Sequence, residues 1–180
     1  MATAEYILPF PTRPVIITQG YDGPISHKRR GNLDYTHSLD FKLDTGTRIL
    51  AAKGGVITLL WDRDSNFYTG LDPRQAFIGN FLEIRHEDGS FSHYQHLEKR
   101  SVQALGLQIG QQVEQGQPIG LTGLSGWIGP YPHLHFMVYR SRLEKLKGPS
   151  RHLETFPVSF QDYDGPLKHC ELSTKFFNQR

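Results

Sequence analysis

Two histidines separated by one residue, His133 and His135, open an apolar, β-prone run that follows a segment rich in glycine and proline. A loop that leads directly into a strand has this pattern. On a strand, residues i and i+2 point to the same face, so both imidazoles would project side by side while Leu134 and Phe136 point the other way. Such a pair can supply a metal ligand and a proton-transfer group. Two histidines on an exposed strand face are the alternative, because a His-x-His pair alone is a weak signal.

Further side chains able to bind metal or transfer protons stand upstream, at the ends of expected strands or in adjoining loops: His27, Asp40 and His96. Catalytic zinc sites use three protein ligands, often histidines with a carboxylate, and keep one position open for water. One carboxylate and two of these histidines would meet that need, and zinc would activate a water and polarise a carbonyl group. The remaining imidazoles would orient the water, stabilise the oxyanion or shuttle the proton.

The composition indicates a globular domain. With 180 residues, 37% of them hydrophobic and 21% charged, the chain is long enough for one domain with a substantial core. The 18 glycines and 11 prolines indicate many turns, which favours an all-β fold. A formal charge of +2 does not indicate nucleic acid as a partner, and none is expected.

The single cysteine, Cys170, excludes an internal disulfide and a cysteine-based zinc site. No apolar run reaches the length of about 18 residues that a membrane-spanning helix needs, so no membrane span is expected. The first residues lack the basic region and the long apolar region of a signal peptide, so the sequence predicts none here.

Alternating hydrophobic residues and turn residues predict the strands. The segment 47–60 is expected to form a hairpin around Gly54–Gly55, and the segment 80–97 a hairpin around an Asp-Gly turn. In the second hairpin, Tyr94 and His96 would share one face and His93 would point to the other. The remaining expectations are strands at 15–18, 35–43, 110–120, 133–139 and 156–160, a long loop at 61–79, a helical turn or loop at 102–108 and a short basic helix within 141–152.

Motifs in three ordered blocks extend over residues 15–140. They are Leu39-Asp-Phe41 with Thr45-Gly-Thr47, Ala51-Ala52 and Gly54-Gly-Val-Ile57; Asn80-Phe-Leu-Glu-Ile-Arg-His86 with Tyr94-Gln-His-Leu97; and residues 113–120 with Thr122-Gly-Leu-Ser-Gly126 and Gly129-Pro-Tyr-Pro-His-Leu-His-Phe136. In order and spacing these blocks resemble the lysostaphin/LytM-type zinc metallopeptidases. The resemblance implies that Asp40 and His135 are zinc ligands and that His96 and His133 are catalytic histidines near the bound water.

The first zinc ligand departs from the commonest family pattern, which has a histidine four residues before the aspartate, where this chain has Thr36. His37 lies three residues before Asp40 and would face the opposite side of a strand. Some family members instead carry this histidine in a loop further upstream, and His27 is similar to that variant. We therefore prefer His27 over His37 as the first ligand.

The resemblance also implies an all-β fold of antiparallel sheets, a split β-barrel-like sandwich of the duplicated hybrid motif type, in which long loops form a groove. The chain would be a single peptidase domain, residues 1–180, with a core at about 15–140 and a C-terminal extension with a late strand at 141–180. The groove would hold an extended peptide. Its candidate residues are Asn80, Tyr21, Tyr35, Trp127 and Tyr131.

The expected function is that of a monomeric zinc-dependent metalloendopeptidase that hydrolyses peptide bonds of bacterial cell-wall peptidoglycan, in the periplasm or outside the cell. A metal-free, catalytically inactive binding or activator domain on the same scaffold is the first alternative, which the displaced histidine keeps open. A phosphocarrier domain of the sugar phosphotransferase type is the second, because two facing histidines pass a phosphoryl group in such domains. Asp40 fits this second alternative less well.

Overall fold

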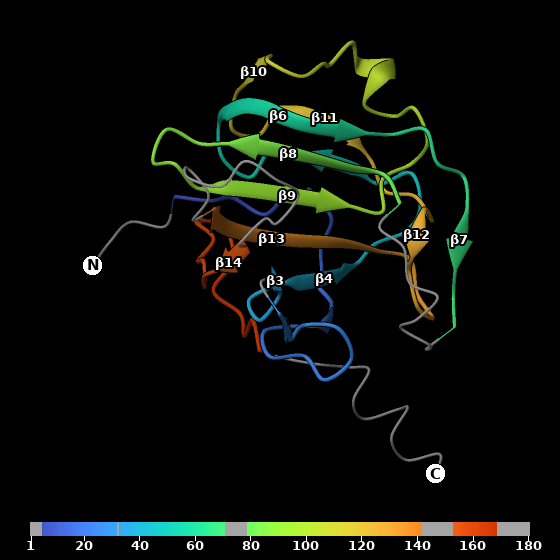
Figure 1. Cartoon of the computed structure of the whole chain (residues 1–180), viewed down its shortest axis with the longest axis vertical. Coiled ribbons are helices and arrows are strands. Elements are labelled where there is room, and N and C mark those ends of the chain that lie inside the picture. Colours follow the sequence, from blue (N-terminus) through green and yellow to red (C-terminus); the bar gives the residue numbers. More distant parts are fainter. Residues whose placement is uncertain (1–4, 32, 71–78, 142–152, 169–180) are drawn as a thin grey trace.

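The computed structural model describes residues 5–31, 33–70, 79–141 and 153–168, which form strands and one short 3₁₀ helix (Figure 1). The expectation of an all-β fold is confirmed. Within these residues, no helix is long and apolar enough to cross a membrane. The elements are β1 (Ile17–Gln19), β2 (Arg29–Arg30), β3 (Leu33–Asp34), β4 (Leu39–Lys42), β5 (Arg48–Leu50), β6 (Gly55–Trp61), β7 (Phe67–Tyr68), β8 (Phe81–Arg85), β9 (Phe91–Gln95), η2 (Gln103–Leu105), β10 (Gln112–Val113), β11 (Pro118–Leu121), β12 (Gly126–Trp127), β13 (His133–Ser141) and β14 (Leu153–Thr155).

The long strand β13 organises the largest sheet. It pairs antiparallel with β9 along one edge, and with β4 and then β14 along the other edge. Beyond β9 the sheet continues through β8 and β6 to β10, and beyond β14 through β3 to β2. Two small two-stranded sheets, β11–β5 and β12–β7, lie outside this path. In Figure 1, β6, β8, β9 and β13 run side by side across the molecule.

Strict alternation along β13 separates the hydrophobic core from the opposite face of the sheet. Leu134 and Phe136 point away from the two histidines, as predicted, and are buried in the main core together with Val138. On the neighbouring strand β4, Leu39 and Phe41 join the same core. Burying a side chain of this size stabilises the fold by about 1.5–3 kcal/mol relative to leaving it exposed. The core therefore holds the register that presents the intervening residues on the other face.

The glycine pair at residues 54–55 does not form the expected hairpin. β5 pairs with β11, whereas β6 joins the large sheet between β10 and β8. The close approach of β8 explains Gly55, because a Cβ atom there would lie 2.2 Å from the carbonyl oxygen of Arg85. The Asp-Gly hairpin between β8 and β9 is confirmed.

The late strand of the C-terminal part lies at a different position from the one predicted. The late strand is β14, earlier than the predicted 156–160, where Phe160 instead forms isolated bridges with Tyr6 and Tyr163. The hydrophobic core takes in Leu8, Phe10 and Phe160, which lie outside residues 15–140. Residues 142–152, where the basic helix is expected, lie outside the described residues, and Ser141 is the last residue of β13. Cys170 and residues 71–78 of the long loop also lie outside them. The single-domain organisation stays a prediction.

A buried histidine next to the β8–β9 turn predicts how stability depends on pH. His86 is 3% exposed, its Nδ1 donates to the carbonyl of Gly54 over 2.9 Å, and burial lowers its pKa from the ordinary value. The pKa of histidine in the unfolded chain is about 6.5, and below that pH the unfolded chain binds more protons than the folded one. The contribution of His86 to the free energy of unfolding is therefore complete above about pH 6.5 and is lost as the pH falls.

We therefore expect the metal-free protein to lose stability as pH falls from about 7 to 5, with His86 contributing at most about 1.4 kcal/mol per pH unit. A His86→Gln variant should lose stability less steeply. Urea unfolding at a series of pH values measures both slopes, and identical slopes in the two proteins would contradict the prediction.

Candidate metal centre and active site

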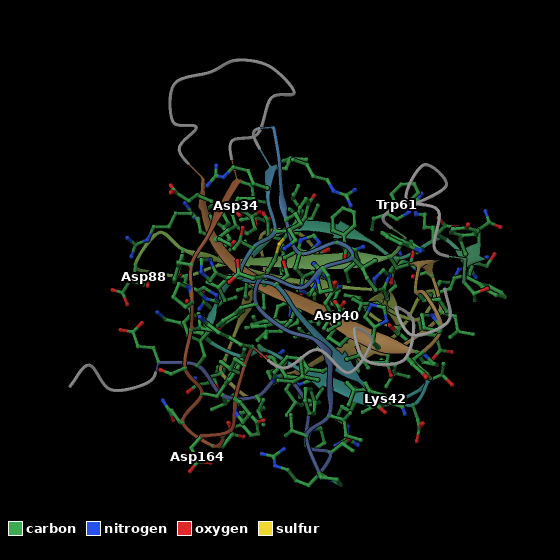
Figure 2. The ribbon with its side chains drawn as sticks, turned by 90° about the horizontal axis from the view of Figure 1, so that it is seen from below. Asp34, Asp40, Lys42, Trp61, Asp88 and Asp164 are labelled. Carbon is green, nitrogen blue, oxygen red and sulfur yellow. The ribbon has the colours of Figure 1, made fainter. Side chains whose placement is uncertain are left out.

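The register of the large sheet places a carboxylate and a histidine side by side. In the pairing of β13 with β4, His135 lies opposite Asp40, and in the pairing with β9 it lies opposite Gln95. Asp40 is 5% exposed, whereas Asp88 and Asp164 are exposed carboxylates, and Figure 2 shows these two near the outline of the molecule with Asp40 away from it. The sheet therefore brings one buried carboxylate against one imidazole.

His96 reaches the same face by a change of backbone conformation. Tyr94 packs in the main core, as the alternation of β9 requires, but His96 has a φ of 69° and lines a cavity together with His135. The expectation that Tyr94 and His96 share a face is therefore wrong. A positive φ is costly for a residue other than glycine, and such strain is concentrated at functional sites.

His27 comes from the loop between β1 and β2. It is fully buried, and its Nδ1 lies 2.8 Å from the carbonyl oxygen of Gly20. Because a carbonyl oxygen only accepts, Nδ1 donates, and Nε2 of the neutral ring carries a lone pair. This Nε2 lies 3.2 Å from Oδ2 of Asp40 and has no hydrogen-bond partner among the described residues. Two groups that both present lone pairs therefore face each other in a buried position.

This arrangement fits a metal ion. One potential ligand atom each from His27, Asp40 and His135 lies within 4.8 Å of the others, and Nδ1 of His135 is 2.7 Å from Oδ1 of Asp40. Two ligand atoms on one tetrahedral zinc ion lie roughly 3.3 Å apart. A cation between the facing lone pairs would satisfy the unpaired Nε2 of His27, and the set of two imidazoles and one carboxylate suits zinc.

The protonation states also suit a metal ligand set. Burial by itself raises the pKa of the Asp40 carboxyl, but the charge that His27 and His133 carry whenever they are protonated, together with the hydrogen bond from His135, outweighs it and lowers the pKa well below its usual range. Burial lowers the pKa of His135. Near neutral pH the carboxylate is therefore ionised and the His135 ring neutral, which are the forms that bind metal.

A second pair of histidines, His96 and His133, stands beside the cluster with ring centroids 4.6 Å apart. Nδ1 of His96 donates to the carbonyl of Ser125 over 2.8 Å, and Nδ1 of His133 donates to the carbonyl of Tyr131 over 2.9 Å. In the neutral rings both Nε2 atoms are therefore free to accept a proton. Burial, and then repulsion from the other imidazoles, lowers the pKa of His96 well below its usual value.

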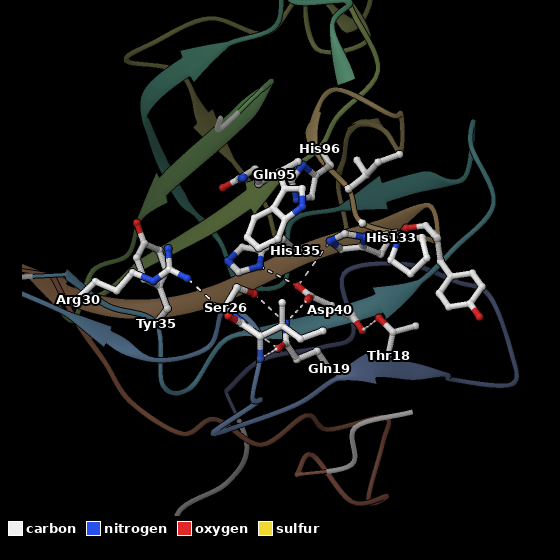
Figure 3. Close-up of a pocket in the computed structure, with 16 residues that line it drawn as sticks. Thr18, Gln19, Ser26, Arg30, Tyr35, Asp40, Gln95, His96, His133 and His135 are labelled. Atoms are coloured by element: carbon white, nitrogen blue, oxygen red, sulfur yellow. Dashed lines mark hydrogen bonds and ion pairs between the residues drawn. The ribbon is translucent and has the colours of Figure 1, made fainter. Parts of the chain in front are cut away.

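These groups line a cavity of about 190 Å³, shown in Figure 3. Three of the expected groove residues, Tyr35, Trp127 and Tyr131, are in its wall, and the cationic side chain of Arg30 lies beside Tyr35. The indole Nε1 of Trp127 donates to the carbonyl of Gly70 over 2.6 Å, which fixes the ring. The cavity thus combines a possible metal centre, two further imidazoles and aromatic walls, an arrangement suited to binding and hydrolysing a peptide.

Two expected groove residues do not line the cavity. Asn80 is fully buried, and its amide donates to the carbonyls of Asp64 and Leu97 while its oxygen accepts from the backbone of Asp64. It therefore ties loops together behind the site. The hydroxyl of Tyr21 is bound to the backbone of Val158, away from the cavity.

His37 is held away from the cluster. Its Nδ1 lies 3.1 Å from the carbonyl oxygen of Thr155, and its ring packs edge-on against Tyr21. His27, not His37, is therefore the histidine beside Asp40 in the structure, while its role as a ligand stays a prediction. Gln19, whose amide contacts Asp40, carries no signal in the sequence, because it directly follows the strand predicted at 15–18 and belongs to no motif.

A curled, mainly antiparallel sheet that carries a buried group of histidines around one aspartate defines the lysostaphin-like class of β proteins. Within that class, the chain belongs to Peptidase family M23, whose family profile matches residues 34–147. The match includes Asp40, His96, His133 and His135 and begins after His27, so it does not bear on the first ligand. Membership of a peptidase family argues against the phosphocarrier hypothesis.

Individual relatives agree with this membership. The chain is 32% identical over 113 residues to the peptidoglycan DD-endopeptidase ShyC of Vibrio cholerae, an alignment that covers 62% of this chain and 22% of ShyC. The chain thus spans about a fifth of the length of the curated relatives it matches.

Solved structures share the fold. A zinc-containing peptidase from Vibrio cholerae is 24% identical with a TM-score of 0.51, covering 75% of this chain and 37% of that one. Lysostaphin from Staphylococcus simulans is 24% identical with a TM-score of 0.50, covering 77% and 48% of the two chains.

Proposed function

We propose that the chain is a zinc-dependent endopeptidase that hydrolyses peptide bonds of bacterial peptidoglycan. The observation that carries this proposal is the buried, unpaired Nε2 of His27, which faces the Asp40 carboxylate beside His135. Such an arrangement is unfavourable without a bound cation or proton, because both atoms are acceptors. His27, Asp40 and His135 would hold the zinc ion.

The remaining histidines would handle protons. Bound zinc supplies Lewis acidity, which activates a water and polarises the scissile carbonyl. His96 and His133 each have Nδ1 held by a backbone carbonyl, so Nε2 is the nitrogen of each neutral ring that would accept a proton from the attacking water. The same nitrogen, once protonated, would stabilise the oxyanion or donate to the leaving amine. The Tyr35 and Trp127 rings would hold the peptide against this centre.

The substrate follows from the relatives rather than from the cavity. The name of ShyC describes a peptidoglycan DD-endopeptidase, and M23 membership makes a peptidase the expected activity. Because peptidoglycan lies outside the cytoplasmic membrane, we place the activity in the periplasm or outside the cell. We expect the chain to act as a monomer and without nucleic acid.

Metal removal tests this proposal. We expect the zinc-loaded protein to release new amino termini from purified peptidoglycan, a strong chelator to lower that rate at least about 100-fold, and stoichiometric zinc to restore it. Zinc should also stabilise the fold, by about 2.7 kcal/mol at a free concentration of 100 times its dissociation constant.

The measurements are amino-group release, bound zinc per chain, and thermal unfolding with and without zinc. A protein that binds no zinc, yet still binds peptidoglycan, would favour the metal-free binding domain over the endopeptidase. Cleavage that persists in the metal-free protein would contradict the role of zinc.

A further inference from the structure

A single buried carboxamide connects the loop that carries His27 to Asp40. Gln19 is the last residue of β1, lies opposite Asp40 in the β1–β4 register, and is 2% exposed. Its Nε2 donates to Oδ2 of Asp40 over 2.9 Å and to the hydroxyl of Ser26 over 2.8 Å. Its Oε1 accepts from the backbone N–H groups of Ile25 and Ser26, at 2.9 and 3.2 Å. Figure 3 shows these contacts around Gln19.

The carboxamide uses its full hydrogen-bonding capacity. A glutamine side chain has two N–H donors and an oxygen that can accept twice, and all of these positions are used here. The orientation is also determined, because the Asp40 carboxylate only accepts and the two backbone N–H groups only donate. No rotation of the amide could preserve these four bonds, so Gln19 fixes the loop and the carboxylate relative to each other.

The loop is also packed tightly onto this side chain. A Cβ atom on Gly23 would lie 2.2 Å from Cγ of Gln19 and 2.7 Å from Cδ. A larger residue would therefore displace the carboxamide. Beside it, Ser26 directly precedes His27, so the two hydrogen bonds that Ser26 makes with Gln19 restrain the backbone that leads to the imidazole.

We propose that Gln19 is a positioning residue for the metal centre, which holds the displaced histidine loop and the Asp40 carboxylate at the separation that a metal ion needs. This inference rests on the proposed function. A histidine on the same strand as the aspartate is positioned by the strand itself, whereas His27 lies 13 residues before Asp40 in a loop and needs a separate restraint. Outer-shell partners of metal ligands commonly change metal affinity 10- to 100-fold.

The test is the zinc affinity of the whole chain, measured by chelator competition. Gln19→Met keeps the length of the side chain and removes its hydrogen bonds, and we expect it to weaken zinc binding about 10- to 100-fold. Thr18→Val is the matched control: Thr18 is equally buried on the same strand, but its hydroxyl donates to the backbone carbonyl of Asp40, over 3.1 Å, not to the carboxylate. We expect this control to weaken binding less than about threefold.

Gly23→Ala provides a second variant, which displaces Gln19 without altering any hydrogen-bonding group, and it should weaken zinc binding in the same direction. Thermal unfolding of each metal-free variant separates lost affinity from lost folding. If Gln19→Met does not fold, Gln19→Asn, whose shorter amide cannot span both partners, replaces it in the comparison.

The visible absorption spectrum of the Co²⁺-loaded variants provides a readout of ligand geometry that is independent of activity, and we expect the Gln19 variants to shift it and Thr18→Val to leave it unchanged. Equal zinc affinity in wild type and the Gln19 variants, or equal losses of affinity in Gln19→Met and Thr18→Val, would overturn the positioning role of Gln19 but not the proposed function. Wild-type protein that binds no zinc would overturn the proposed function together with this role.

Discussion

Replacing His27 by alanine is expected to lower zinc affinity by at least about 100-fold. Loss of an outer-shell partner lowers metal affinity by up to about 100-fold, and loss of a ligand should lower it by at least as much. Of the proposed ligands, His27 is the one whose imidazole is fully buried with an unpaired Nε2, 3.2 Å from the Asp40 carboxylate. Without it, two protein ligands remain, and structural precedent for catalytic zinc requires three. Peptidase activity should fall with the bound metal. Zinc per chain after gel filtration and chelator competition measure the loss.

His37→Ala is the matched control for this experiment. His37 lies three residues before Asp40 in the sequence, closer than His27, but its ring contacts Tyr21 and its Nδ1 the Thr155 backbone. We expect this variant to keep about one zinc per chain and its activity, with at most a modest loss of stability. Zinc lost from His37→Ala and retained by His27→Ala would show that the first ligand had been assigned to the wrong histidine.

Replacing His96 by asparagine is expected to lower kcat by about 100- to 10,000-fold while leaving zinc bound, because that is the usual contribution of a positioned proton-transfer group. The ion pairs of Asp40 are with His27, His133 and His135, and the ring centroid of His96 is 6.2 Å from that of His135. Asparagine is chosen because it tolerates the left-handed backbone, φ 69°, better than alanine does. The change therefore removes the imidazole with little added strain.

The control for His96→Asn is His93→Ala. His93 is on β9, the strand that ends just before His96, but its ring stacks on Phe81, and it does not line the cavity. Steady-state kinetics on a defined peptidoglycan peptide and zinc analysis of each variant separate the two effects. Loss of zinc in His96→Asn would indicate that His96 is a ligand, and unchanged kcat with zinc present would remove it from the catalytic mechanism.

A local pattern in the sequence was sufficient to predict which face of β13 is buried. Along β13, the alternation of His133 and His135 with Leu134 and Phe136 predicts two imidazoles on one side and two core residues on the other, and the structure has this arrangement. The motif blocks likewise predicted the family and the all-β fold. These inferences succeed because the side-chain period of a strand is a local property of the chain.

Positions that depend on distant backbone could not be predicted in this way. The glycine pair at 54–55 has the composition of a hairpin, yet β5 and β6 pair with different partners, and the approach of Arg85 explains Gly55. Asn80 belongs to a family motif and is expected in the groove, but its buried amide binds the backbone of Asp64 and Leu97 instead. In both cases the outcome depends on which strands meet, which a local pattern does not encode.

The sequence by itself determined the all-β class, the family and the face of β13 that carries His133 and His135, because hydrophobic alternation and motif order are read directly from the residues. Only the tertiary structure decided that His27, not His37, lies against Asp40, that His96 turns to the cavity face, and that Gln19 links Asp40 to the loop of His27. The physical reason is that loop path, backbone strain and buried hydrogen bonds are set by the packed sheet as a whole.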